Sequence, residues 1–271
     1  MRRTLFLLAA ALGSLSAAVP PAADPREIIR KSVEALQTDW TQAPNYSYTE
    51  RAVHSKKRSQ PVAMTFRVSM INGVPYRHLL AIDDQPLPLK QQTVEERKFT
   101  SETEKMPSES ESERADRVYS KQRDRDHAIL MEIADAFDFT LVGEDSVDGY
   151  DCWVLDARPR PGYTPRNAAA KVLTAMHVRL WIEKNQSQWV KVEAEVFQPV
   201  SFYGVMAKVS PGTRLTLEQQ PVSDSVWLPK RFTLRVNASA LGFINENSTD
   251  DKTYSNYAPQ PEITARLETK R

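Results

Sequence analysis

The feature of this sequence that most constrains its fold is a series of short apolar segments between Phe137 and Tyr257, joined by turns and almost free of helix signals. Apolar and polar side chains alternate most clearly within 176–197. The alternating residues are Met176, Val178, Leu180 and Ile182 on one strand and Val190, Val192, Ala194 and Val196 on the next. A period of two is typical of β-strands, and antiparallel neighbours form one twisted, curved sheet with a hollow side. The sequence therefore predicts an α+β fold, mainly antiparallel β, built on a curved meander sheet with a hollow side.

The same hairpin is apolar on its second face as well. Trp181, Trp189 and Phe197 occupy the positions opposite to the alternating aliphatic residues. Large contiguous apolar surfaces are rarely left in water. We therefore expect a helix or a ligand to cover the second side.

Two helical regions are expected to cover the concave side. From Asp24 to about Trp40, a capping aspartate, a proline suited to a first helical turn and an apolar stripe predict an amphipathic helix. The stretch 89–136 is dense in alternating charge, which predicts two solvated helices hinged around Pro107 to Ser112. This charged helical insertion is the candidate lid.

The other strands are bounded by turn residues, among them Asn72-Gly73 and Asp148-Gly149, which favour tight hairpins. The predicted strands outside the hairpin are 46–54, 62–71, 74–82, 139–143, 151–158, 202–209, 214–220, 226–236, 240–247 and 252–257.

A single domain is expected over 24–258, followed by a C-terminal tail over 259–271. The chain begins with two arginines directly after Met1, then an apolar core and small residues up to Ala18, which predicts a cleavable signal peptide over 1–18. Cys152 is the single cysteine, so no lipobox cysteine follows the expected cleavage site. We expect a periplasmic or secreted protein with no transmembrane segment in the mature chain.

Composition argues against several classes of partner and reaction. The chain has 36 Lys and Arg against 35 Asp and Glu, so no net field favours nucleic acid or anionic lipid. Its 8 glycines accompany 18 prolines, which argues against glycine-rich phosphate loops. No motif for a catalytic nucleophile, a metal site or a P-loop occurs in the sequence. We therefore expect a protein that is not an enzyme, with no catalytic residue, no metal and no cofactor.

Four local features have competing interpretations. His127 follows two aspartates that could ligate a metal, but the alternating charge indicates a solvated helix surface. Cys152 is better suited to core packing than to reactivity, because no basic cluster follows it. The loop 158–173 is rich in proline and arginine and is either a surface rim or an anion site. Glu193 and Glu195 could perform acid/base chemistry or form a charge ladder on the outer face.

The remaining candidate site is apolar. Large side chains on several strands should point toward the hollow side, where methionines adapt to flexible ligands. If helices cover that side incompletely, the cavity can bind an acyl chain or an apolar peptide at roughly 25 cal/mol per Å² of buried apolar surface. Otherwise the same residues form a filled core. The candidate groove residues are Met64, Phe66, Val68, Met70, Leu180, Ile182, Val192, Leu215, Leu217, Phe232 and Leu234.

Several short sequence motifs resemble those of the LolA-like proteins of outer-membrane lipoprotein sorting. They are WIEK at 181–184, WVKVE at 189–193, WLP at 227–229 and YSNY at 254–257, within a similarity that extends over about 24–257. The resemblance implies an unclosed half-barrel of about eleven strands with helices at its mouth. It also implies a periplasmic carrier of lipoprotein acyl chains or lipid that performs no chemistry.

The resemblance leaves a second function open. Relatives of this fold also sense envelope stress, so an envelope protein could be the partner instead of a lipid. Such a protein could bind in the groove, or on a rim or convex face that carries Trp153, Trp181 and Trp189.

Overall fold

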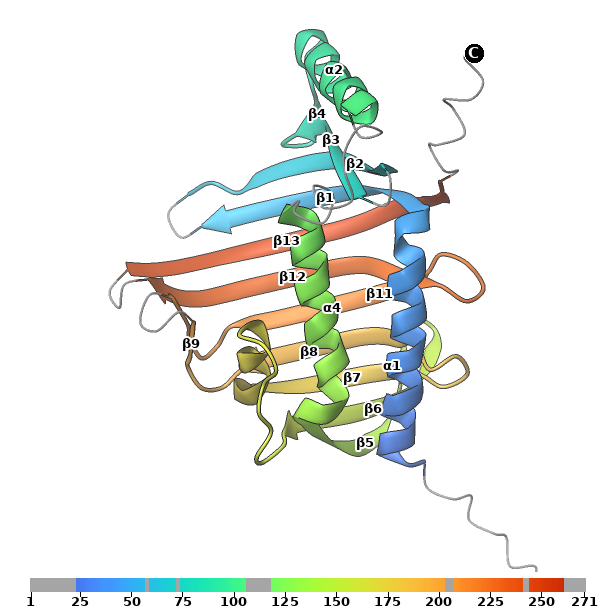
Figure 1. Ribbon diagram of the computed structural model, residues 1–271, viewed down its shortest axis with the longest axis vertical. Coiled ribbons are helices and arrows are strands. Elements are labelled where there is room, and N and C mark those ends of the chain that lie inside the picture. Colours follow the sequence, from blue (N-terminus) through green and yellow to red (C-terminus); the bar gives the residue numbers. More distant parts are fainter. Residues whose placement is uncertain are drawn as a thin grey trace, which may run out of the picture.

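A computed structural model describes residues 23–56, 59–71, 74–105, 118–202, 207–240 and 244–260. These residues form one open antiparallel sheet with helices packed on it (Figure 1). The strands follow the order β4-β3-β2-β1-β13-β12-β11-β8-β7-β6-β5, and β10 pairs with β12 and β9 outside this path. The path does not close into a barrel, which confirms the expected half-barrel of about eleven strands.

The described part of the chain begins with a helix and ends with a long strand. The helices are α1 (Pro25–Gln42), α2 (Leu89–Lys105) and α4 (Val118–Ala136), with short 3-10 helices η1 (Ala43–Asn45) and η3 (Ala169–Ala175). The strands are β1 (Tyr46–Lys56), β2 (Val62–Ile71), β3 (Val74–Ile82), β4 (Gln85–Pro86), β5 (Phe137–Val147), β6 (Tyr150–Pro159), β7 (Met176–Glu183), β8 (Trp189–Val196), β9 (Val200–Phe202), β10 (Ala207–Val209), β11 (Arg214–Pro221), β12 (Trp227–Ala240) and β13 (Ile244–Pro259).

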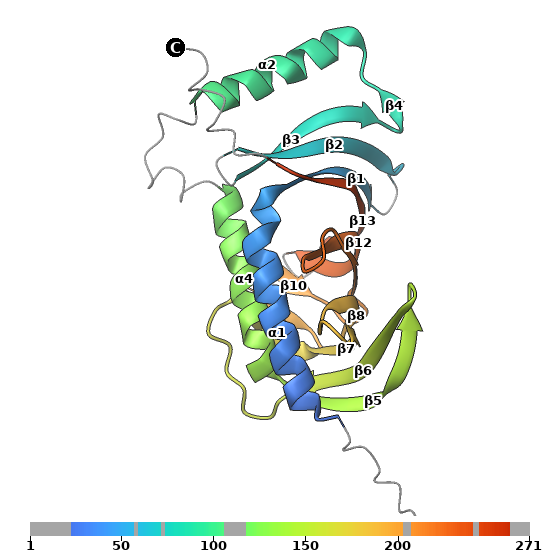
Figure 2. The ribbon, with the colours of Figure 1, turned by 90° about the vertical axis from the view of Figure 1, so that its right-hand side faces the viewer.

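The helices lie on both faces of the sheet. Helices α1 and α4 lie side by side across the hollow side (Figure 2). Helix α2 packs against β3, where the ring of Phe99 lies 5.3 Å from that of Tyr76 and 6.0 Å from that of His78. These two β3 residues alternate with Arg77, which pairs with Val68 on the hollow side. Of the expected lid, α4 therefore covers the concave side and α2 packs on the convex side.

Helix α1 begins as its sequence predicts. The Asp24 carboxylate accepts a hydrogen bond from the backbone N–H of Arg26 at 3.0 Å, and Pro25 occupies the first turn. On the inner face, Ile28 and Ile29 are 8% and 2% exposed. The helix is therefore held to the sheet by its apolar stripe.

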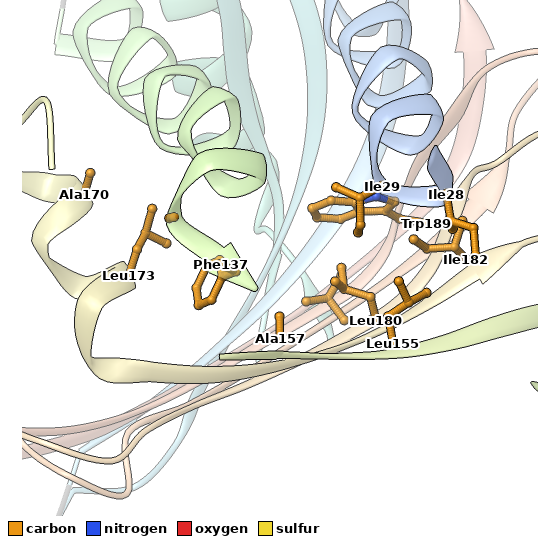
Figure 3. Packing of buried hydrophobic residues seen from close by; sticks show 12 residues of the cluster. Ile28, Ile29, Phe137, Leu155, Ala157, Ala170, Leu173, Leu180, Ile182 and Trp189 are labelled. Atoms are coloured by element: carbon orange, nitrogen blue, oxygen red, sulfur yellow. The ribbon is translucent and has the colours of Figure 1, made fainter. Parts of the chain in front are cut away.

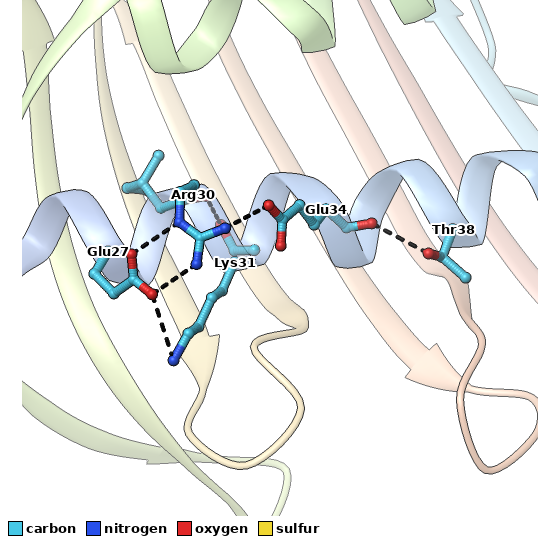
Figure 4. Close-up of polar contacts among 7 residues, drawn as sticks. Glu27, Arg30, Lys31, Glu34 and Thr38 are labelled. Carbon is cyan, nitrogen blue, oxygen red and sulfur yellow. Dashed lines mark hydrogen bonds and ion pairs between the residues drawn. The ribbon is translucent and has the colours of Figure 1, made fainter.

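The outer face of α1 is solvated and charged. Arg30 forms ion pairs with Glu27 at 2.7 Å and Glu34 at 2.5 Å (Figure 4). The hydrogen bond from Arg30 lowers the pKa of Glu27 to about 2. Exposed pairs of this kind contribute little to stability. They keep one face of α1 in water and so orient the opposite face toward the sheet.

The core fills the hollow side under α1 and at the start of β5. Ile29 of α1 lies over Leu180 and Trp189, and Leu173 of η3 lies beside Phe137 (Figure 3). These side chains are almost completely buried. This end of the half-barrel is therefore a packed interior, stabilised by burial of apolar surface.

A β-bulge changes the faces expected for the β7–β8 hairpin. Ile182 pairs with Trp189 but Trp181 pairs with Lys191, so β8 has one additional residue at this point. The bulge places Trp189 on the inner face with Ile182, whereas Val190 joins Trp181 in a cluster on the outer face. The strict alternation expected from the sequence is wrong here because the extra residue reverses the parity.

The β5–β6 hairpin covers the apolar cluster on the outer face. The indole N–H of Trp181 donates to Asp145 at 3.1 Å, and the ring of Tyr150 lies 4.7 Å from that of Trp227. Trp181 is 8% exposed. The sheet's own turn therefore covers Trp181, whereas Phe197 on the same face is 42% exposed.

Strand β13 is one continuous strand where the sequence predicts two. It pairs with β12 on one side and β1 on the other. At the expected break, Asp250 lies 2.6 Å from the ring nitrogen of His54, and Asp251 pairs with Arg231 at 2.7 Å. The aspartates are poor strand formers locally, but partners on both neighbouring strands stabilise them in the sheet.

Some predictions lie outside the described residues, namely the signal peptide over 1–18, the hinge around Pro107 to Ser112 and the Asn72-Gly73 turn. Within the described ranges, no helix combines the length and the apolarity that a membrane crossing requires.

Candidate ligand-binding site

A cavity of about 340 Å³ lies between the sheet and the C-terminal end of α1. Helices line one side through Leu36 and Trp40 of α1 and Leu130 of α4, joined by Ala43 and Pro44. The sheet and its turns line the other side through Tyr48, Met70, Pro75, Trp189, Leu217, Gln219, Trp227, Leu228, Pro229, Tyr254 and Tyr257. The volume is at the small end of the roughly 300–1,000 Å³ range of ligand sites, so it suits one chain better than several.

One wall of the cavity is a group of three tyrosines. The ring of Tyr48 lies 5.3 Å from that of Tyr257 and 5.8 Å from that of Tyr254. The Tyr257 hydroxyl donates to the carbonyl of Pro229 at 2.7 Å, and burial raises the pKa of Tyr257 above its ordinary range. The wall therefore presents ring surface, with its most buried hydroxyl already bonded.

A buried carboxylate lies at the other side of the cavity. Asp39 is 2% exposed, and its Oδ1 accepts from the backbone N–H of Trp227 at 2.9 Å and from the amide of Gln188 at 3.4 Å. Burial raises the pKa of Asp39 to about 6, although both hydrogen bonds act in the opposite direction. Its second oxygen, Oδ2, is buried with no hydrogen-bond partner in the described structure.

Asp39 predicts a pH dependence of stability. Because its folded pKa is raised from 3.8 to about 6, folding favours the protonated form, and this contribution is lost as the pH rises through about 6. We expect the stability of the wild type relative to Asp39→Asn to fall by about 1–3 kcal/mol between about pH 4 and about pH 7. Urea unfolding of both proteins at each pH measures this difference. A difference that does not vary with pH would contradict the prediction.

Sequence reasoning missed Asp39, although the chain carries a signal for its burial. Ile29, Ser32, Leu36 and Asp39 follow each other at spacings of three and four, so a carboxylate interrupts the apolar stripe of α1. An acidic residue on such a stripe is expected to be buried. The identity of its partners could not be read from the sequence, because Gln188 and Trp227 are far away in the chain.

The register places the candidate groove residues on one face of the sheet. Val192 pairs with Leu217 and Leu217 with Phe232, and the same row reaches Met64 on β2. The structure nevertheless gives them different surroundings. Met70 and Leu217 line the cavity. Leu180, Ile182 and Val192 are buried in the core under α1, Phe66 and Val68 are buried near β3, and Met64, Leu215, Phe232 and Leu234 are half-buried.

Polar side chains interrupt this face on β13 and β1. Lys252 stands in the row between Phe232 and β1. Glu50, 5% exposed, accepts a hydrogen bond from Arg77 at 2.5 Å, and that guanidinium lies 3.9 Å over the ring of Phe66. The apolar lining is therefore divided by these side chains, and β13 and β1 contribute tyrosines, not charged groups, to the cavity.

The competing interpretations of isolated residues are resolved at three positions. Cys152 is fully buried, and burial raises its pKa to about 11, as expected for a packing residue. Glu193 pairs with Lys191 at 2.6 Å in the outer charge ladder. The expected surface position of His127 is wrong: its Nε2 lies 2.6 Å from the amide oxygen of Gln37, and its ring stacks on Trp40 at 5.4 Å. The ring is held between α4 and α1.

The proline-rich loop is anchored to α4 through a buried acid. Glu132, 3% exposed, accepts hydrogen bonds from the Tyr163 hydroxyl, from the backbone N–H of Arg166 at 3.0 Å and from the Asn167 amide at 2.7 Å. The Arg166 side chain pairs with Asp135. The loop is therefore a docked rim, and its Arg166 is already paired.

Neither a family model nor a curated protein matches this sequence. Solved structures do match over most of their length. A LolA superfamily protein from Nitrosomonas europaea is 12% identical, with 90% of this chain and 97% of that chain covered and a TM-score of 0.33. A putative outer membrane lipoprotein-sorting protein domain from Vibrio parahaemolyticus is 10% identical, with 89% and 98% covered and a TM-score of 0.38. The Mycobacterium tuberculosis lipoprotein LppX is 12% identical, with 88% and 98% covered and a TM-score of 0.29.

LolA-like structures are thus among the solved structures that this chain resembles, as its short sequence motifs predicted. At these identities and TM-scores, the similarity carries no information about ligand or partner.

Proposed function

We propose that this protein is an exported, non-catalytic carrier or binding protein that holds a hydrophobic ligand in the groove of its half-barrel. The observation that carries this proposal is the cavity of about 340 Å³ that α1, α4 and the sheet leave unfilled. Its walls are mostly aliphatic and aromatic, which suits an acyl chain of a lipid or of a lipoprotein. Export is supported by the charged start, apolar core and small residues of 1–18.

A lipid is favoured over an envelope protein as the ligand. The tryptophans expected on a convex binding surface do not form one, because Trp153 and Trp189 pack into the inner cluster and Trp181 is 8% exposed. The exposed large apolar residues of the described chain are distributed over several elements, as Val62 of β2, Met131 of α4 and Val142 of β5 illustrate. Such isolated residues need no partner. The cavity under the last turns of α1 is the stronger candidate site.

Binding of an acyl probe tests the proposal. We expect delipidated protein to bind a fluorescent acyl probe with an uncharged polar end, and Leu217→Trp to weaken binding by about tenfold or more, because the larger ring fills the cavity. Fluorescence titration measures both affinities. Leu215→Trp is the matched control, since Leu215 lies on the same strand and face but does not line the cavity.

Two results would count against the carrier. One is the absence of probe binding by correctly folded wild-type protein. The other is equal weakening by the two tryptophan variants, which would indicate general damage to the sheet instead of a blocked cavity. Native mass spectrometry of the protein from its own envelope offers an independent check, because a retained lipid adds mass.

A further inference from the structure

Four buried polar atoms have no hydrogen-bond partner within the described residues, and three of them belong to side chains that line the cavity. They are Oδ2 of Asp39, Oε1 of Gln188, Nε1 of Trp189 and Oε1 of Gln219. Asp39, Trp189 and Gln219 line the cavity and are 2%, 3% and 6% exposed. Their backbones belong to α1, β8 and β11, so three separate elements bring polar atoms to one otherwise apolar space.

Such an arrangement is costly in an empty protein. A buried donor or acceptor without a partner costs about 1–3 kcal/mol, and a buried charge costs more. Asp39 is also in the last turn of α1, where the helix dipole disfavours a negative charge. No Lys, Arg or His of the described chain forms an ion pair with it. The local structure satisfies Oδ1 and leaves Oδ2, which is buried in a residue that lines the cavity, without a hydrogen-bond partner.

The chemistry of these atoms is selective. Oδ2 of Asp39 and Oε1 of Gln219 accept hydrogen bonds, and a carboxylate additionally favours a positive charge. A primary ammonium group offers three N–H donors and a positive charge in a compact volume. The indole N–H of Trp189 is then available to an ester or hydroxyl oxygen next to the ammonium group. An anionic head group would instead be repelled by Asp39.

Building on the proposed function, we propose that the cavity binds a single-chain amphiphile with a primary ammonium group, which donates to Asp39 and Gln219 while the chain lies against Leu36, Leu217 and Leu228. The polar end and the chain of the ligand thus each have a defined set of contacts.

The test compares amphiphiles of one chain length. Dodecylammonium, dodecanol, dodecanoate and dodecyltrimethylammonium, each below its micelle concentration, compete with the uncharged acyl probe at about pH 7.5, where Asp39, with its pKa of about 6, is ionised. We expect dodecylammonium to bind about tenfold or more tightly than dodecanoate. It should also bind more tightly than the trimethyl form, which has no N–H to donate.

Substitutions of Asp39 and Gln219 test whether the preference for dodecylammonium depends on their unpartnered oxygens. Asp39→Asn should remove the preference for dodecylammonium, whereas Glu34→Gln, on the solvated face of the same helix, should leave it unchanged. Gln219→Leu serves if Asp39→Asn does not fold, and it should weaken dodecylammonium binding several-fold without weakening that of dodecanol.

The outcomes separate this inference from the proposed function. Equal binding of all four amphiphiles, or a preference that survives Asp39→Asn, overturns the ammonium site while the acyl cavity stands. Absence of binding by every amphiphile and by the uncharged probe overturns both.

Discussion

Phe137→Ala is expected to lower the free energy of unfolding by about 3–5 kcal/mol, the range typical of a buried phenylalanine truncated to alanine. Phe137 is 1% exposed and lies where α4 ends and β5 begins. Its ring contacts Phe139 at 6.2 Å and packs in the cluster with Leu173. Truncation leaves a void at the point where α4, β5 and η3 meet. Urea unfolding followed by tryptophan fluorescence measures the loss.

The chain provides a matched control for this substitution. Phe197 is 42% exposed and stacks on His177 at 4.3 Å at the surface. Phe197→Ala should cost about 1 kcal/mol or less, because little buried volume is removed. Equal losses for the two variants would show that Phe137 is not a centre of the core. It would also show that burial in this cluster contributes less than its packing indicates.

Local sequence patterns predict the parts of this fold that depend on interactions between residues close together in the chain. The N-terminal helix begins at its capping Asp24, and the strands β2 and β3 have the predicted bounds, with a regular apolar alternation in β2. The Asp148-Gly149 turn also forms as expected, with φ of 52° and 86° at its two residues. Positive φ at both central positions is what a tight hairpin requires. In each case the signal lies within a few residues of the structure it specifies.

The differences from prediction arise where the local structure depends on residues that are distant in the chain. The bulge at Trp189 reverses the parity of β8, and its position is set by pairing with Ile182. Strand β13 continues through Asp250 and Asp251 because His54 stands opposite Asp250 and the Arg231 side chain reaches Asp251 from the neighbouring strand. Neither cause is visible in a window of one strand. For the same reason the sequence indicated an apolar trough but not the polar strip of β13 and β1 that divides it.

The half-barrel is therefore filled at one end and open at the other. Under the first turns of α1, Ile29, Leu180 and Ile182 are packed to near-complete burial. At the last turns of α1, large side chains such as Trp40 of the helix and Tyr48 of β1 line the cavity but do not fill it. The sequence left a filled core and an open trough as alternatives, and both occur in the same sheet. The packed end supplies stability, so the open end can retain unsatisfied groups that a ligand would complete.

Glu132→Ala is expected to release the rim loop from α4 and to lower the free energy of unfolding by about 2–4 kcal/mol, because three hydrogen-bond donors of the loop lose their buried acceptor. The donors are the Tyr163 hydroxyl, the Arg166 backbone N–H and the Asn167 amide. Loops held by few contacts open locally before the whole protein unfolds. Limited trypsin digestion should therefore cut the variant faster after Arg160, Arg166 and Lys171 than it cuts the wild type.

Asp135→Ala is the control for this release, because it lies on the same helix and contacts the same loop. Its pair with Arg166 is exposed, with side-chain exposures of 52% and 68%, so its loss should change stability by no more than about 1 kcal/mol. Cleavage of Asp135→Ala should remain close to the wild-type rate. If the two variants were cut equally fast, the exposed ion pair and not the buried acid would hold the loop, and burial of Glu132 would be a consequence of docking instead of its cause.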